Sequence, residues 1–177
     1  MPYSYSKFKH EVKHQILKNI NHPCRVLDVG AGSGCYGDML IGHFDAVDAL
    51  EIYPNYIKMF DLESKYNNVI VGDITTYNFD SYDFIIMGDV LEHLTAENGQ
   101  RIIRKIQQNR QAVLVAVPYL YEQGIEYNNV YETHLQPDLT PEVMEKRYPE
   151  LKLLYGDEQY GYYVNKYFCE SCHKQSE

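Results

Sequence analysis

Apolar and polar positions along the chain alternate between two patterns, one typical of buried strands and one typical of amphipathic helices. Near-continuous apolar runs predict strands over residues 24–29, 46–52, 69–71, 82–87 and 112–117. Apolar positions at helical spacing predict helices over residues 6–20, 36–42, 55–66, 97–109 and 142–148. Strands and helices in this order favour a parallel sheet that helices cover on both faces.

The pattern changes toward the C-terminal end. Residues 151–155 and 160–168 are two extended runs, and the segment between them has the length of a hairpin turn. The sequence therefore predicts a three-layer α/β fold, Rossmann-like, with about seven strands that are mostly parallel and an antiparallel last strand. We expect an N-terminal helix within residues 1–22, one domain over residues 23–168 and a flexible tail over residues 169–177.

Composition and charge exclude several classes of protein. The chain has 177 residues, of which 45% are apolar and 23% charged, as in globular domains. No apolar run approaches the ~20 residues of a membrane span, and the first residues do not form a secretory signal. The net charge of −9 repels phosphate backbones, so nucleic acid is not the expected partner.

The four cysteines do not form a disulfide framework, and we expect a cytoplasmic protein without membrane attachment. Cys169-Glu-Ser-Cys172-His173 has the spacing of a haem attachment motif, but we interpret it as part of the tail.

A glycine-rich segment follows the first predicted strand, at residues 30–34. Glycines allow the backbone to approach a ligand closely, and the following helix presents its N-terminal N–H groups. The spacing is G-x-G-x-G, so the dinucleotide fingerprint G-x-G-x-x-G fails at Cys35. A nicotinamide dehydrogenase is therefore disfavoured.

An acidic residue ends or follows each of the next three strands. Glu51 lies 21 residues after Gly30, where a carboxylate can accept hydrogen bonds from two ribose hydroxyls. Asp73 and Asp89 follow the third and fourth strands. Ligands of doubly wound sheets bind at the carboxyl ends of the strands, so we expect these groups to line one binding site.

Four motifs in this order give the chain a family resemblance. VLDVGAGSG, LEIYPNYI, VIVGDITTYNF and YDFIIMGDVLEHL together resemble the class I S-adenosylmethionine-dependent methyltransferases, over roughly residues 23–118. The resemblance implies S-adenosyl-L-methionine as cofactor and a small-molecule or glycan-like acceptor that is methylated at oxygen or nitrogen. Carried over by position, the cofactor-binding residues are Asp28, Gly30, Ala31, Gly32, Gly34, Glu51, Ile52, Asp73, Ile74 and Asp89.

The resemblance also implies a role for each part of this set. Asp28 and the glycines would shape the pocket for the methionine portion, and Glu51 would bind the ribose. Asp73 and Ile74 would face the adenine, while Asp89 would lie beside the methionine portion or the acceptor.

Four polar residues are candidates for catalysis: Asp89, Glu92, His93 and His134. The first three share one face of the turn after the fourth strand. His134 lies in a polar loop over residues 119–138, which is long enough to suggest a lid or an acceptor pocket. Because the fourth and fifth strands are neighbours in this topology, we expect all four residues to converge at the mouth of the cofactor pocket. One neutral histidine would then be the general base.

Two alternatives remain open at this point. The candidate catalytic residues also resemble the metal-binding set of small-RNA 2′-O-methyltransferases, in which a divalent metal activates the acceptor hydroxyl. The LEH tripeptide is also common in relatives without a metal, so we assign no metal ligand from the sequence. The second alternative is a binding or regulatory module that keeps the cofactor fold without turnover, because 177 residues leave little room for an acceptor-binding domain.

Overall fold

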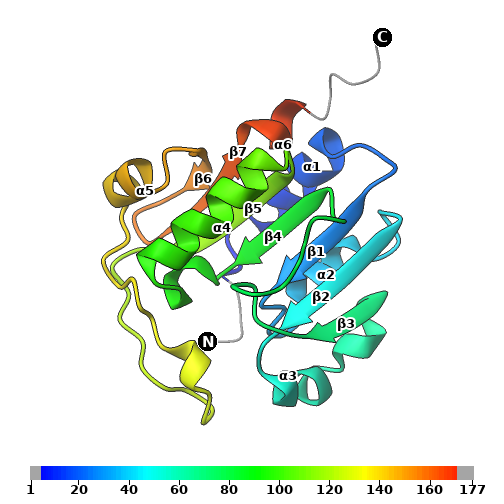
Figure 1. Cartoon of the computed structure of the whole chain (residues 1–177), viewed down its shortest axis with the longest axis horizontal. Helices are drawn as coiled ribbons and strands as arrows, with labels where there is room; N and C mark the ends of the chain where they lie inside the picture. Colours follow the sequence, from blue (N-terminus) through cyan, green and yellow to red (C-terminus); the bar gives the residue numbers. More distant parts are fainter. Residues whose placement is uncertain (1–4, 171–177) are drawn as a thin grey trace.

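The computed structural model describes residues 5–170. These residues form one seven-stranded sheet with helices around it, and Figure 1 shows their arrangement. The strand order is β3-β2-β1-β4-β5-β7-β6, and the first five strands are parallel. The strands are β1 (Arg25–Val29), β2 (Ala46–Glu51), β3 (Asn68–Val71), β4 (Phe84–Gly88), β5 (Ala112–Pro118), β6 (Leu151–Gly156) and β7 (Tyr160–Asn165). Strand β7 pairs antiparallel with both β5 and β6. The predicted seven-stranded, mostly parallel sheet with an antiparallel last strand is confirmed.

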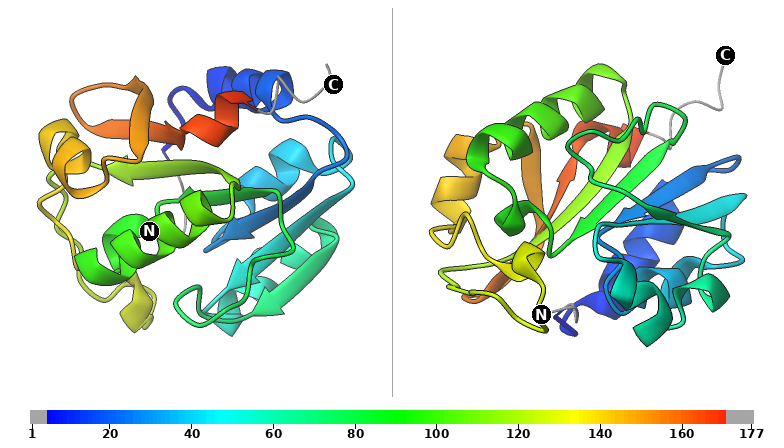
Figure 2. Two further views of the ribbon diagram at one scale, coloured as in Figure 1. Left: turned by 45° about the horizontal axis from the view of Figure 1, so that its top comes forward. Right: turned by 60° about the horizontal axis from the view of Figure 1, so that its bottom comes forward.

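Helices cover both faces of this sheet (Figure 2). They are α1 (Lys9–Asn19), α2 (Cys35–Leu40), α3 (Pro54–Met59), α4 (Ala96–Gln108), α5 (Pro141–Arg147) and α6 (Lys166–Glu170). Side chains of α1, α2 and α6 form one hydrophobic core with one face of the sheet. Side chains of α4 and α5 form a second core with the other face. The three-layer architecture that the sequence predicts is therefore present.

Helix α4 shows how local sequence and burial act together. The Thr95 hydroxyl accepts a hydrogen bond from the Asn98 N–H at 3.2 Å and so caps the first turn. Ile102, Ile103 and Ile106 then recur at helical spacing and are almost completely buried against the sheet. Burying each of these side chains stabilises the fold by about 1.5–3 kcal/mol.

Two predicted elements end earlier than the hydrophobic pattern indicates. The helix expected over residues 55–66 stops at Met59, and Asp61 has the left-handed φ of 50° before a short 3₁₀ turn, η1 (Leu62–Ser64). The extended run expected over residues 160–168 stops at Asn165. Its side-chain oxygen accepts from the Phe168 N–H at 3.2 Å, which starts α6.

The expected N-terminal helix and tail can be placed only in part. Val12 and Ile16 of α1 are fully buried in the first core, so this helix is integral to the domain. Residues 1–4 and 171–177, which hold most of the predicted tail, lie outside the described residues. Within residues 5–170, the helices are too short or too polar to cross a membrane.

Candidate active site

Two cavities lie at the carboxyl ends of the parallel strands. The first has a volume of about 220 Å³ and is bounded by the ends of β1, β2, β3 and β4. The second has a volume of about 630 Å³ and lies beside the ends of β4 and β5. Asp89 and His93 line both cavities, so these two residues stand where the cavities meet.

Most of the residues that the sequence assigns to the cofactor lie on the wall of the first cavity. Eight of the ten are there: Gly30, Ala31, Gly32, Glu51, Ile52, Asp73, Ile74 and Asp89. Asp28 and Gly34 do not line it. The structure thus brings the ends of four strands together as expected, since parallel strands place their carboxyl ends at one edge.

The glycine segment after β1 has a backbone that favours glycine. Gly30 has a φ of +64° and Gly32 a φ of +50°. A Cβ on Gly30 would lie 2.5 Å from the Cγ2 atom of Val90, so a side chain there would displace the Val90 side chain. The segment is therefore fixed both by its conformation and by the contact with Val90.

Glu51 ties this glycine segment to the end of β2. Its carboxylate accepts hydrogen bonds from the N–H groups of Gly32 at 3.0 Å and Tyr53 at 2.8 Å. The side chain is only 3% exposed, and burial raises the pKa of its carboxyl although these two donors favour the charged form. A carboxylate has about four acceptor sites, so further donors from a ligand can still bind.

Asp28 lies behind the cavity rather than on its wall. It is 1% exposed and accepts a hydrogen bond from the Tyr66 hydroxyl at 2.5 Å, while that hydroxyl accepts from the Gly37 N–H at 3.1 Å. Burial raises the pKa of the Asp28 carboxyl to about 7, against the opposing effects of Tyr66 and the Lys9 charge. Asp28 therefore connects β1 to the start of α2 and to the segment before β3.

Asp89 occupies a strained position directly after β4. Its φ is 58°, and its N–H donates to the Ala116 carbonyl at 2.9 Å. The Asp89 Oδ1 atom accepts from the Tyr160 hydroxyl at 2.6 Å. The sequence analysis missed Tyr160 because it lies 71 residues away, on the antiparallel strand β7.

His93 and His134 lie side by side, which confirms the expected proximity. The centroids of their rings are 4.7 Å apart, and the rings meet edge to face. The His93 Nδ1 atom is 3.2 Å from the Thr133 carbonyl oxygen, and the His134 Nδ1 atom is 2.7 Å from that of Tyr121. Because a carbonyl only accepts, we assign the hydrogen of each neutral ring to Nδ1, which leaves the Nε2 lone pair available.

Burial keeps both rings uncharged at neutral pH. It lowers the pKa of His93 to about 4, with a further contribution from His134. Burial also lowers the pKa of His134. The pair therefore presents two neutral imidazoles.

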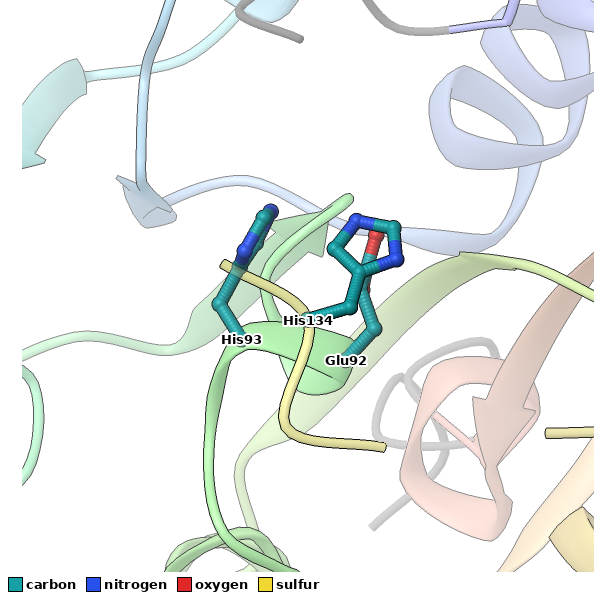
Figure 3. A group of neighbouring side chains, drawn as sticks. All are labelled: Glu92, His93 and His134. Atoms are coloured by element: carbon teal, nitrogen blue, oxygen red, sulfur yellow. The ribbon is translucent and has the colours of Figure 1, made fainter. Parts of the chain in front are cut away.

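Glu92 is the third member of this group and comes from the 3₁₀ turn η2 (Leu91–His93). It is 1% exposed, and among the described residues neither carboxylate oxygen has a hydrogen-bond partner. Burial, and then the nearby Asp89 charge, raise the pKa of its carboxyl well above the ordinary value. In Figure 3, Glu92 projects beside the His134 ring, and the side chain of His93 extends in the same direction.

A hydrogen-bond clamp at Gln136, which the sequence analysis did not identify, holds the loop in place. The Gln136 side-chain amide donates to the carbonyls of Leu91 at 2.7 Å and Leu94 at 3.0 Å. Its oxygen accepts from Arg147 at 2.9 Å and from the Tyr148 hydroxyl at 2.8 Å. The first two bonds fix the loop after β5 to the turn after β4, and the other two join the loop to the end of α5.

The loop over residues 119–138 contributes to the walls of both cavities. It contains a 3₁₀ turn, η3 (Val130–Glu132), and lies beside the ends of β4 and β5 (Figure 1). Residues 129–133 line the first cavity, while residues 119–121 line the second together with Tyr5 and Tyr160. The loop that was expected to be a lid or an acceptor pocket thus contributes side chains to both cavities.

Comparison with known proteins finds one matching family model and many structures with a similar fold. A family model described as a methyltransferase domain matches residues 27–109. No match was found among curated proteins. Many solved structures share the fold with low sequence identity.

One such structure is an S-adenosylmethionine-dependent methyltransferase from Clostridium acetobutylicum ATCC 824. It is 12% identical, with a TM-score of 0.66 and 92% of each chain covered. The amino pentose methyltransferase CalS10 from Micromonospora echinaspora is 12% identical, with 89% of each chain covered and a TM-score of 0.60. The N-methyltransferase NodS from Bradyrhizobium japonicum is 13% identical, with 90% of this chain and 97% of NodS covered and a TM-score of 0.58.

The raised pKa of Asp28 predicts a pH dependence of stability. An aspartate has a pKa of about 3.9 in the unfolded chain, so between about pH 4 and pH 7 the folded state holds a proton that the unfolded state releases. Stability of the wild type should therefore fall as the pH rises through this window, by up to about 4 kcal/mol from this group. Asp28→Asn removes the contribution, so its stability relative to the wild type should be greater at pH 8 than at pH 4.

Urea unfolding of both proteins at pH 4, 6 and 8 measures this difference. Other titrating groups are common to the two proteins and cancel in the comparison. Equal slopes of stability against pH would show that Asp28 is not protonated in the folded state.

Proposed function

We propose that the chain is a class I S-adenosylmethionine-dependent methyltransferase that methylates a small-molecule or glycan-like acceptor, at oxygen or nitrogen. The observation that carries the proposal is the first cavity. Its wall gathers the glycine segment and the carboxylates of Glu51, Asp73 and Asp89 from the ends of four strands. Those are the positions that the family motifs assign to the cofactor.

The residues of the first cavity fit S-adenosyl-L-methionine in their chemistry. Glu51 can accept hydrogen bonds from ribose hydroxyls, since its buried carboxylate keeps acceptor capacity beyond the two backbone donors. The absence of side chains on Gly30 and Gly32 lets the backbone approach the ligand. Ile74 and Leu50 provide apolar surface on the same wall for the adenine ring.

The first cavity is too small to take the cofactor without a movement of its wall. Its volume of about 220 Å³ is below the 300–1,000 Å³ that is usual for small-ligand sites. Residues 129–133 and Leu135 line it, and we propose that this part of the loop shifts when the cofactor enters.

Bound S-adenosylmethionine supplies a methyl group on a sulfonium, so the acceptor atom gains the methyl while the carbon–sulfur bond breaks and its electrons stay on sulfur. The chain's own residues would align the acceptor and remove its proton. The Nε2 atom of His93 or His134 is available as an acceptor of that proton. Asp89 stands between the cavities and would orient the acceptor, with Tyr160 fixing its carboxylate.

The second cavity supports an acceptor of small-molecule size. Its volume of about 630 Å³ lies within the usual range, and Tyr5, Tyr119, Tyr121 and Tyr160 are on its wall. Tyrosine rings present an apolar face and a polar hydroxyl, which suits planar or sugar-like molecules. Similar folds belong to CalS10, an amino pentose methyltransferase, and to MmcR, a mitomycin 7-O-methyltransferase.

Ligand binding followed by turnover tests the proposal. S-adenosylhomocysteine at one hundred times its Kd should stabilise the fold by ~2.7 kcal/mol, which raises the melting temperature by roughly 5–10 °C for a chain of this length. Labelled S-adenosylmethionine incubated with pooled metabolites should then yield a labelled product. Absence of a thermal shift with both S-adenosylmethionine and S-adenosylhomocysteine would refute the proposal. Binding of either ligand without methyl transfer to any acceptor would favour the alternative of a binding or regulatory module without turnover.

Glu51→Gln tests the ribose contact. Loss of a charge-assisted pair of hydrogen bonds costs about 1.5–3 kcal/mol, so the Kd for S-adenosylhomocysteine should rise roughly 10- to 150-fold by calorimetry. Glu63→Gln, at an exposed position in η1, is the matched control and should bind like the wild type. Unchanged affinity in a folded Glu51→Gln variant would remove Glu51 from the cofactor site.

A further inference from the structure

The second cavity combines acidic and aromatic side chains. The described residues on its wall include the carboxylates of Asp89 and Glu92 and four tyrosines, but no lysine or arginine. Glu92 and His93 from η2 lie together with His134 from the loop after β5 (Figure 3), and all three line this cavity. We propose that Glu92, His93 and His134 bind a protonated amine, so that the second cavity takes an acceptor with a primary ammonium group.

The first argument is the carboxylate of Glu92. It is 1% exposed, and neither oxygen has a hydrogen-bond partner among residues 5–170. A buried polar group without a partner is costly, and a buried carboxylate is the most costly case. An ammonium group that enters the cavity supplies both the missing opposite charge and the missing hydrogen-bond donor.

The second argument is the orientation of the two histidine rings. Each Nδ1–H donates to a backbone carbonyl, that of Thr133 for His93 and that of Tyr121 for His134. The remaining ring nitrogen, Nε2, is then a hydrogen-bond acceptor in both neutral rings. Together with the Glu92 carboxylate, the cluster therefore offers three acceptors and no side-chain donor to a ligand. A group that only donates, such as an ammonium, is its natural partner.

The spacing of these groups matches the shape of an ammonium. One nitrogen or oxygen atom of each of the three residues lies within 4.8 Å of those of the other two. The hydrogens of a primary ammonium point to three corners of a tetrahedron, so charge-assisted bonds of about 2.8 Å place their acceptors about 4.6 Å apart. Each residue can therefore accept one of the three hydrogens without a shift of the backbone.

Tyrosine rings complete a wall that suits an organic cation. The rings of Tyr5 and Tyr160 stack with their centroids 4.8 Å apart, and the Tyr121 ring meets that of His134 edge to face at 5.4 Å. All three tyrosines line the second cavity. Aromatic faces attract a cation and also cover apolar surface. The cavity therefore favours an amine over a neutral or anionic molecule of the same shape.

This preference has a consequence for the methylated atom, which rests on the proposed function. His93 lines both cavities, so an amine held by its ring lies next to the cofactor cavity. One proton of the ammonium passes to the Nε2 atom of His93 and from there to water. After rotation about its carbon–nitrogen bond, the neutral amine forms a bond to the methyl carbon, while the carbon–sulfur bond breaks and its electron pair stays on sulfur. The acceptor atom is then nitrogen rather than oxygen.

Two probes of nearly equal shape test the amine site without any turnover. Phenethylamine carries a ring and a primary ammonium at pH 7, whereas 2-phenylethanol has a hydroxyl in place of the ammonium. Their Kd values are measured by NMR titration of the full chain, with EDTA present so that no metal ion contributes. The charge-assisted hydrogen bonds should make phenethylamine bind about 10-fold more tightly or better.

Two variants and a control assign this preference to the cluster. Glu92→Gln keeps the size of the side chain but removes its charge, so the two probes should bind almost equally. His134→Phe keeps an aromatic ring but removes one acceptor, and should lower the preference by about 2- to 10-fold. Glu122→Gln removes a charge from an exposed position of the same loop that does not line the cavity, and should keep the full preference.

A further measurement on the wild type does not depend on the folding of any variant. The imidazole Nε2 resonances of His93 and His134 should shift when phenethylamine is added. Equal Kd values for the two probes, no binding of phenethylamine, or unshifted resonances would each overturn the proposal. A preference that is unchanged in folded Glu92→Gln would overturn it as well.

Binding of S-adenosylhomocysteine, measured separately on the same proteins, distinguishes the two proposals. A protein that binds the nucleoside but does not prefer the amine refutes only the amine site. A protein that prefers the amine through Glu92 but does not bind the nucleoside refutes only the proposed function.

Discussion

The hydrogen bonds of Gln136 are the constraint on which the candidate site depends. The side chain is 3% exposed and joins three parts of the chain: the turn after β4, the loop after β5 and the end of α5 with Tyr148 behind it. The backbone N–H groups of Leu135 and Gln136 add two bonds to the Glu92 carbonyl, at 2.8 and 3.0 Å. Each buried group left without a partner would cost roughly 1–3 kcal/mol, so the loop is held to the turn in one position. That position places His134 against His93 and leaves Asp89 at the junction of the two cavities.

The fold tolerates the unfavourable features of this site, because its stability comes mainly from the hydrophobic cores. Two hydrophobic cores, one on each face of the sheet, hold the strands in place without any contribution from the polar cluster. The site itself contains unfavourable features: the left-handed backbone at Asp89 and the buried carboxylate of Glu92. Such features persist only where the surrounding structure fixes them, and they are common at functional sites.

What could be predicted from the sequence follows from the geometry of parallel sheets. Glu51 ends a strand, and the glycine segment, Asp73 and Asp89 each follow one. Because parallel strands end at one edge of the sheet, the convergence of these groups needed no knowledge of side-chain contacts. The proximity of His134 to His93 could also be predicted, because these residues follow β5 and β4, which are neighbouring strands. The roles of Gln136 and Tyr160 could not be predicted from the sequence. Their hydrogen-bond partners lie 45 and 71 residues away, and no local sequence pattern indicates such bonds. The early ends of α3 and β7 depend on Asp61 and Asn165, whose local effects outweigh the hydrophobic period.

The central claim is that the first cavity holds the cofactor and opens toward the acceptor cavity at Asp89 and His93. A crystal structure of the complex with S-adenosylhomocysteine tests this claim most directly. The account predicts the ribose hydroxyls against the Glu51 carboxylate, the adenine beside Asp73 and Ile74, and the sulfur atom next to Asp89 and His93, directed toward the second cavity. A ligand bound elsewhere, or one whose sulfur faces away from the second cavity, would contradict it.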